Sequence, residues 1–390
     1  MIFEGKRELV YTATITNIES IPNYDRVEWA TINEGWKVII SKSDNFAVGD
    51  TCVYFEVDSK VPEDDERFAF LAKRKYKIKT IKMCGVLSQG LVMPLAMFPE
   101  VQTKEAGVPL TEKLGVTYAV AADNDRKGSG RNPNAKYNSM SSRHQNLAKK
   151  KWWRWLMKRE WGRKLLFVFF GKKKDNPRGF PTFVSKTDEE RIENMPWILN
   201  DEEDWIATEK LDGTSCTYAL ERKGKNKYEF YVCSRNVRQK DESQECYHDH
   251  NIYWDMAFKY DIENHLRHHL DTHEEDDWVC IQGEGVGSVQ GNPLKLKEDD
   301  LYVFNFITSS RGRESSDVAR CNVESWGMKH VPILGVVNFT GETLETMKAA
   351  ADGYSVVNPD VLREGIVYRD QNGVRSFKNV SNKFLLEKHE

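Results

Sequence analysis

Residues 1 to about 110 contain a succession of short β-strand patterns with no convincing long helix between them. About five segments alternate apolar and polar residues or are rich in β-branched and aromatic residues, and turn residues separate them. They read VYTATITNI, RVEWATI, WKVIIS, TCVYFEV and KIKTIKMCGVLSQGLVMPL. Such a series favours a small Greek-key barrel of the OB type, which commonly offers a face to nucleic acid. The alternative is a barrel that only packs against a neighbouring domain.

Composition is typical of a soluble globular protein. The 390 residues suffice for two or three domains, and a hydrophobic content of 39% is ordinary. The first residues lack the apolar run of a signal peptide, and the longest strongly apolar run, LLFVFF at 165–170, is too short to span a bilayer. The 7 cysteines include no CxxC pair, which favours neither a zinc site nor a disulfide framework. We therefore expect a cytoplasmic protein without membrane segments.

Positive charge is concentrated in one part of the chain. The net charge is -3, yet residues 126–178 contain 17 Lys and Arg against 2 acidic residues. The polar stretch 123–148 is typical of a linker, and a predicted helix after it holds four tryptophans among basic residues, between positions 152 and 161. Such a helix would stack on bases and neutralise phosphates. Alternatively, it docks its Trp face on a domain or lies on a membrane surface.

Strand and helix patterns mix from about residue 179 onward, which predicts an α+β domain of about 210 residues. Residues 251–270 show helical spacing with one apolar side, which indicates a scaffolding helix. The apolar residues are Ile252, Met256, Phe258, Ile262 and Leu266. The histidines 268, 269 and 273 and the acidic run 274–277 offer metal ligands, but no ligand spacing is present, so a solvated helix end is the favoured interpretation.

A lysine and an aspartate interrupt what otherwise reads as a buried strand, ATEKLDGTSCTYAL at 207–220. In an extended chain Lys210 and Asp212 face the same way, and Asp-Gly then turns the chain. A lysine becomes a nucleophile when its amine is neutral, and desolvation beside other cations lowers its pKa in that direction. The K-x-D-G pattern alone occurs often by chance, so companion motifs decide its meaning.

Further motifs occur in a consistent order along the chain. They are CSRN with Arg235, VCIQGEGVG with Glu284, LYVFNF with Phe304, REGIVYR with Glu364, and RSFKNVSNKF with Lys378 and Lys383. The set resembles the motifs of the covalent nucleotidyltransferases, namely ATP-dependent ligases and mRNA capping enzymes. With FPTFVSKTDEERIEN at 180–194, it is most similar to ATP-dependent RNA ligases with an N-terminal OB-type domain. We accordingly expect an OB-like β-barrel domain (1–115), a basic Trp-rich linker (116–178) and a nucleotidyltransferase domain of antiparallel sheets and helices (179–390).

The resemblance implies a role for each motif residue. Lys210 would attack the α-phosphate of ATP and hold AMP through a phosphoramidate, while Lys378 would stabilise phosphate charge. Asp212, Glu284 and Glu364 would bind Mg²⁺ (or Mn²⁺), partly through its waters, which suits the preference of Mg²⁺ for a few carboxylates plus water. The other nucleotide-binding candidates are Phe304 stacked on adenine, Glu209 at adenine, Arg235 at the ribose or a phosphate, Arg191 at the triphosphate, Gly213 and Lys383.

Two of these assignments carry alternatives. By alternation Tyr302, Phe304 and Phe306 share one face of a strand, and core packing is the commoner fate of such a stripe. The last motif of similar enzymes has two lysines separated by one residue, and this chain has Val380 in the second place. Lys383 either substitutes for that lysine or is a solvated residue.

The segment IVYRDQNGVRSFK predicts a β-hairpin because Asn-Gly suits a tight turn. A plain two-residue loop would put Lys378 opposite Val367, on the face away from Glu364. Because shared chemistry needs both side chains on one face, we predict a three-residue loop, Gln371–Gly373, with a bulge. That loop would bring Lys378 opposite Ile366.

The resemblance implies an ATP-dependent RNA ligase that acts through lysyl-AMP and RNA-adenylate. Its substrate would carry 3′-OH and 5′-phosphate ends, as in a nicked RNA duplex under repair, and the protein would act as a monomer. The barrel and basic linker would hold the RNA, so binding would weaken as salt rises. A DNA ligase or capping guanylyltransferase shares the lysine chemistry, but those families commonly carry a trailing OB domain. A non-catalytic RNA-binding relative is the third alternative, although unused buried charges are costly to keep.

Overall fold

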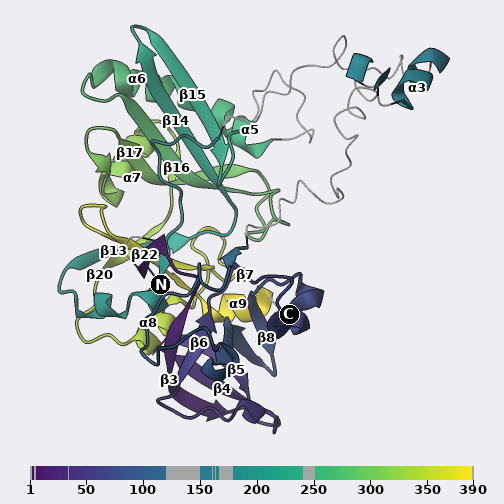
Figure 1. Cartoon of the computed structure of the whole chain (residues 1–390). Helices are drawn as coiled ribbons and strands as arrows, with labels where there is room; N and C mark the ends of the chain where they lie inside the picture. The colour runs from purple at the N-terminus through teal and green to yellow at the C-terminus, as the bar shows by residue number, and fades with distance from the viewer. Residues whose placement is uncertain are drawn as a thin grey trace. The chain divides into compact units, whose positions relative to one another are not determined.

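A computed structural model describes residues 2–3, 6–33, 35–119, 150–159, 161–162, 164–166, 179–239 and 251–388 (Figure 1). The chain divides into two compact units, one made of residues 1–119 and 179–390 and the other of residues 120–178. The predicted linker at 123–148 lies outside the described residues. Within the described ranges, the structure has no helix with the length and apolar character required to cross a bilayer.

The smaller unit contains the helix α3 (Lys151–Met157), which lies in the predicted tryptophan-rich segment. Trp153 is buried, whereas Trp152, Trp155 and Trp161 are exposed. The Arg159 guanidinium carbon lies 3.8 Å from the centroid of the Trp155 ring. Exposed aromatic rings therefore lie beside cationic groups in this unit, which is the combination that stacks on bases.

The N-terminal domain is built on a five-stranded antiparallel sheet with the order β10-β6-β3-β4-β5. Strand β3 is 11 residues long, and a bulge between Ile15 and Asn17 lets its first half pair with β6 and its second half with β4. A bulge bends and twists a strand, so one strand serves both sides of the barrel. The strands are β3 (Val10–Ser20), β4 (Val27–Ile32), β5 (Trp36–Ser41), β6 (Thr51–Phe55) and β10 (Leu91–Pro94). Short strands complete the domain: β1 (Ile2–Phe3), β2 (Lys6–Arg7), β7 (Ser59–Lys60), β8 (Thr80–Met83), β9 (Val86–Gln89) and β11 (Thr117–Tyr118).

Two hydrophobic clusters stabilise this domain, and alternation along β6 explains both. Val53 and Phe55 point into one cluster, where Phe55 contacts Phe68 of the 3₁₀-helix Glu66–Arg74 edge to face. Cys52 and Tyr54 point into the other cluster, on the opposite face of the strand. The predicted OB-type barrel is thus confirmed, with apolar side chains on both faces of its central strands.

The second domain consists of two sheets. The first has the order β12-β22-β21-β13-β20, and the second has the order β15-β14-β16-β17-β18 with β19 parallel to β17. The first sheet contains β12 (Glu190–Arg191), β13 (Asp204–Lys210), β20 (Ile333–Asn338), β21 (Gly365–Asp370) and β22 (Ser376–Val380). The second contains β14 (Thr214–Gly224), β15 (Lys227–Ser234), β16 (Trp278–Val286), β17 (Asp300–Thr308), β18 (Gly312–Arg313) and β19 (Lys329–His330).

Helices cover the sheets of this domain. Residues of α5 (Ile252–Lys259), α6 (Ile262–Thr272) and α7 (Ser316–Ser325) share a buried cluster with β14, β16 and β17. Met347 of α8 (Leu344–Ala351) packs with the aromatic residues of the first sheet, and α9 (Asn382–Lys388) comes directly after β22. Together the two domains confirm the predicted α+β class.

The prediction of one helix across 251–270 is wrong. The helix is interrupted between α5 and α6 at Asp261, which has a left-handed backbone with φ of 47°. The other four residues of the predicted apolar side are buried in one cluster. Phe258 is 54% exposed because it comes six residues after Ile252 and so lies on a different side of α5.

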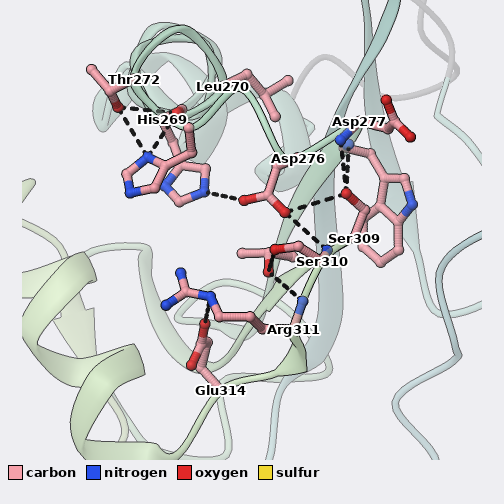
Figure 2. Close-up of polar contacts among 12 residues, drawn as sticks. His269, Leu270, Thr272, Asp276, Asp277, Ser309, Ser310, Arg311 and Glu314 are labelled. Atoms are coloured by element: carbon pink, nitrogen blue, oxygen red, sulfur yellow. Dashed lines mark hydrogen bonds and ion pairs between the residues drawn. The ribbon is translucent and has the colours of Figure 1, made fainter.

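The predicted solvated end of α6 is also wrong in part, because His269 and Asp276 are buried. Figure 2 shows Asp276 between the helix and the β17–β18 turn: its carboxylate contacts His269 Nε2 at 3.0 Å and accepts from the backbone N–H of Ser310 at 2.9 Å. Burial opposes ionisation of Asp276, but hydrogen bonds from Ser310 and His269 outweigh it and lower its pKa to about 2. The group fastens α6 to the second sheet, and within the described ranges no His, Cys, Asp or Glu cluster forms a ready-made metal site.

A buried hydrogen-bond network at Asn194 joins the two domains within the larger unit. The Asn194 side chain accepts from Trp36 Nε1 at 2.7 Å and donates to Glu56 Oε1 at 2.9 Å and to Glu190 Oε1 at 2.6 Å. Trp36 and Glu56 belong to the barrel, and each is at most 1% exposed. Because buried polar groups are costly unless hydrogen-bonded, the network makes Asn194 a fixed junction between the domains.

Candidate active site

Lys210 is the last residue of β13, and the turn after it leads into β14 of the second sheet. Its backbone pairs with Gly365 of β21, and Glu364 directly precedes that partner. Lys210 Nζ lies 2.6 Å from Glu364 Oε2, with the two side chains 26% and 17% exposed. A charge-assisted hydrogen bond of this length fixes the amine at the strand end.

The prediction of a three-residue loop with a bulge is wrong. Strands β21 and β22 pair Val367 with Lys378 and Ile366 with Asn379, and the loop closes with Asp370 N donating to Arg375 O at 3.1 Å. The premise failed because Glu364 lies before β21 begins, so alternation along the strand does not govern its direction. In the observed register, Lys378 lies on the same face as Val367 and therefore as Lys210.

Two further carboxylates surround the amine. Glu284 lies on β16 opposite Tyr302 of β17, and Asp212 is 9% exposed in the turn after β13. Burial, together with the charges of Glu364 and Asp212, raises the pKa of Glu284 to about 8, although Lys210 opposes the shift. The raised pKa of Glu284 marks a buried carboxyl that has other acidic groups beside it.

The expectation of a neutral amine is wrong for the ligand-free protein. Burial lowers the pKa of Lys210, but the carboxylates of Glu364, Glu284 and Asp212 outweigh it, so the pKa is raised above its usual value. The sequence argument considered desolvation and neighbouring cations, whereas the charges closest to the amine are acidic. Lys210 is thus protonated at neutral pH in this state.

The three carboxylates fit a hydrated divalent cation by their chemistry, since Mg²⁺ prefers a few carboxylates plus water. Glu284 carries a raised pKa that a cation would relieve, whereas Glu364 and Asp212 are each paired with a lysine, at 2.6 Å and 2.7 Å. Within the part of the chain that the structure describes, they do not form a ready-made set of three ligands. Binding of a metal ion by Glu364 and Asp212 would therefore require Lys210 and Lys388 to move away from these carboxylates.

Two cationic residues lie side by side near Lys210. Strand β12 runs parallel to β22, and Arg191 pairs with Lys378 across them. Arg191 thus lies in a strand that places it next to Lys378. The Arg191 guanidinium carbon is 5.5 Å from the centroid of the Trp36 ring, and its Nη1 is buried without a hydrogen-bond partner. An unpartnered buried donor of this kind suits an anionic ligand.

Phe304 and Phe306 lie in different hydrophobic clusters, although the sequence placed them on one face of the strand. The pairing of β16 and β17 shifts between Gln282 and Gly283, which skips Phe304 and reverses the alternation beyond it. Phe304 and Tyr302 consequently pack in a cluster between the sheets, whereas Phe306 belongs to the helix-covered core. The prediction that all three aromatic residues share one face is wrong because the bulge adds one residue to the strand.

Glu209 and Arg369 are two further buried charged residues on β13 and β21, and the register of these strands places them on opposite faces of the sheet. Glu209 is 2% exposed, its Oε2 accepts from the backbone N–H of Val356 at 2.9 Å, and its Oε1 is buried without a partner. Burial raises its pKa. The guanidinium carbon of Arg369 lies 5.7 Å from the centroid of the Phe304 ring. The Phe304 ring with the Arg369 cation beside it is suited to stacking on a purine base, and the free carboxylate oxygen of Glu209 is suited to accepting from an amino group.

Gly213 must remain glycine because the turn after β13 packs closely against β16. A Cβ atom at this position would lie 2.3 Å from the carbonyl oxygen of Gly285 and 3.1 Å from Glu284 Cγ. The close approach is what brings Asp212 and Glu284 together.

Two of the nucleotide-binding residues predicted from the sequence form ion pairs with acidic residues outside this cluster. Arg235 is exposed, and its Nη2 pairs with Asp188 and lies 3.4 Å from Tyr118 Oη. Lys383 is 67% exposed, and its Nζ lies 4.0 Å from Asp352 Oδ2. Their predicted nucleotide contacts remain predictions.

Sequence reasoning did not single out Arg369 or Lys388. Arg369 is 3% exposed and its Nη1 donates to Thr208 Oγ1 at 3.2 Å, while Lys388 Nζ lies 2.7 Å from Asp212 Oδ2. Arg369 ends the quoted REGIVYR motif and alternates with Val367, so register alone signals it. No local pattern signals Lys388, because its partner is far away along the chain.

Comparisons with known proteins agree with this geometry. An OB-fold domain model matches residues 9–95, and the RNA ligase family model matches residues 203–384. A structure of Naegleria gruberi RNA ligase with PPi is 28% identical over 98% of this chain and 99% of that one, with a TM-score of 0.69. A mutant of that ligase with ATP and Mn is 27% identical, with a TM-score of 0.70 and the same coverage of both chains. A comparison with the curated proteins gave no match. The chain therefore carries an OB-fold domain followed by a domain of the RNA ligase family, and over nearly its whole length it is similar to RNA ligase structures solved with ATP and Mn.

Proposed function

We propose that this RNA ligase works through a lysyl-AMP intermediate on Lys210. The supporting observation is the position of its amine, 2.6 Å from Glu364 and under the electrostatic influence of Glu284 and Asp212. In the first step, Lys210 Nζ loses one proton to become a neutral amine, bonds to the α-phosphorus of ATP, and loses a second proton to solvent as the phosphoramidate forms. The bond from that phosphorus to the bridging oxygen breaks, and pyrophosphate leaves with the electron pair.

The charges around Lys210 account for how the amine becomes reactive. A bound Mg²⁺ or Mn²⁺ would screen the carboxylates of Asp212, Glu284 and Glu364 and neutralise phosphate charge. With those carboxylates screened, burial of Lys210 dominates and lowers its pKa, which favours the neutral nucleophile. Lys378 and Arg191 lie next to each other on the same sheet and supply fixed positive charge for the phosphates.

The remaining candidates supply the base and ribose contacts. Phe304 would stack on adenine, and the unpartnered Glu209 Oε1 would accept from the adenine amino group. Gly213 keeps the turn close to β16. Arg235 and Lys383 would have to leave their acidic partners, Asp188 and Asp352, to reach the nucleotide.

In the second step AMP passes from Lys210 to an RNA 5′-phosphate, and in the third a 3′-hydroxyl attacks that phosphate and expels AMP. We propose a nicked RNA duplex as the substrate and a monomer as the active form. The barrel and the basic segment around α3, with its exposed Trp152, Trp155 and Trp161, would hold the RNA.

The decisive experiment supplies α-labelled ATP and Mg²⁺ and asks whether label remains on the denatured protein. The wild type should retain label, and Lys210→Ala should retain none. The labelled enzyme is then given a nicked RNA duplex, a nicked DNA duplex, or single-stranded RNA with the same ends. Sealing of the RNA nick well above the other two substrates is expected. Label on Lys210→Ala, or equal sealing of DNA, would contradict the proposal.

A further inference from the structure

The last described turn of α9 brings a cation to the carboxylate cluster. Lys388 Nζ lies 2.7 Å from Asp212 Oδ2, and the Asp212 side chain is 11% exposed. The same amine lies 5.1 Å from the centroid of the Phe384 ring, one helical turn earlier. A charge pair on one side and an aromatic ring on the other hold the long side chain in place.

The position of α9 is itself fixed. Ser381 Oγ donates to Asp352 Oδ1 at 2.7 Å and accepts from the backbone N–H of Phe384 at 3.1 Å, so the start of the helix is capped. Leu385 packs against Val380 of β22 and Leu87 of the barrel. Because the cap at Ser381 and the packing of Leu385 fix the position of α9, they also fix the direction in which Lys388 leaves the helix.

Lys388 and Lys383 leave α9 in different directions. Five residues apart, they are separated by roughly 140° around the helix axis. Lys383 is 67% exposed and its Nζ lies 4.0 Å from Asp352, whereas Lys388 is 47% exposed and contacts the aspartate two residues after the nucleophile. Of these two lysines, only Lys388 contacts the cluster around Lys210.

We propose that Lys388 is a phosphate-binding residue of the adenylation site, which contacts the β- or γ-phosphate of ATP and stabilises pyrophosphate as it leaves. This inference rests on the proposed function. An ammonium group has three N–H donors, so Lys388 can donate to a phosphate oxygen whether or not it still contacts Asp212. When the bond between the α-phosphorus and the bridging oxygen breaks, that electron pair adds charge to the departing diphosphate. A cation at this position therefore favours the bond-breaking step.

The test measures nucleotide affinity in a background that cannot form the adduct. ATP and AMP binding are measured with Mg²⁺ for Lys210→Met and for the double variant with Lys388→Ala. A lost charge-assisted hydrogen bond should weaken ATP binding about 10- to 100-fold. AMP affinity should stay within about twofold, because AMP lacks the phosphates that Lys388 contacts. Equal loss for both nucleotides, or loss for neither, would overturn the inference.

Adenylation of the otherwise native enzyme provides the second measurement. Lys388→Ala should form labelled adduct at least about tenfold more slowly at subsaturating ATP, and Lys388→Arg should restore part of the rate because it keeps the charge. Lys225→Ala, which removes an exposed lysine on the β14–β15 turn, is the matched control. A large defect in Lys383→Ala with a normal Lys388→Ala would assign the contact to Lys383 instead. If the wild type forms no adduct, the proposed function fails; if it does and Lys388→Ala equals it, only this inference fails.

Discussion

Glu364→Gln should make the Lys210 amine more reactive toward an acylating reagent and should at the same time slow adenylation. The substitution removes one negative charge 2.6 Å from Lys210 Nζ while keeping the side-chain shape. A hydrogen bond between charged groups contributes about 1.5–3 kcal/mol, so its loss should lower the pKa of Lys210. At a fixed pH below that pKa, the neutral fraction of the amine should rise about 10- to 100-fold.

The assay is acylation by an amine-selective reagent without metal or ATP, followed by mass spectrometry of the Lys210 peptide. Lys225 in the same digest is the internal control, since it is exposed and lies outside the carboxylate cluster around Lys210. Adenylation of Glu364→Gln should fall at the same time, because a proposed ligand of the divalent cation is lost. Unchanged or slower acylation of Lys210, with Lys225 unaffected, would refute the claim that carboxylates keep this amine protonated.

Three other predictions concern the frame of the site. Gly213→Ala should abolish adenylation and lower the melting temperature, because the new Cβ would lie 2.3 Å from a backbone oxygen, whereas Gly179→Ala has open space and should match the wild type in both measurements. Asn194→Ala should lower the free energy of unfolding by about 1–3 kcal/mol for each buried partner left unsatisfied, as measured by denaturant titration. Burial lowers the pKa of His330 to about 4, so the folded state binds fewer protons there, and stability should fall as pH drops from about 6.5 to about 4. His330→Leu should show a smaller loss across that pH range in the same titration.

Local patterns predicted the fold class and several contacts of the site well. Strand alternation indicated the barrel, and the K-x-D-G turn indicated that Lys210 and Asp212 share one space. These features depend on neighbouring residues, which a sequence displays directly. The close approach at Gly213, by contrast, depends on which strand lies opposite the turn.

The errors arose where a single residue alters the geometry of its strand. The bulge at Phe304 directs Phe306 into the helix-covered core, and no residue in the sequence indicates that a bulge occurs there. The hairpin argument applied strand alternation to Glu364, which precedes the strand. The protonation of Lys210 depends on charges that only tertiary structure brings together, and the same holds for Lys388.

The junction at Asn194 has a practical consequence for anyone who would trim this enzyme to a minimal catalytic fragment. Cutting away the barrel removes Trp36, which covers the Arg191 guanidinium and donates to Asn194. The remaining fragment would expose to water the side chains of Arg191 and Asn194 that Trp36 contacts, next to the strand that carries Lys378. Loss of sealing in such a fragment would not by itself reveal an RNA-binding role for the barrel, since the newly exposed surface lies beside the proposed phosphate site.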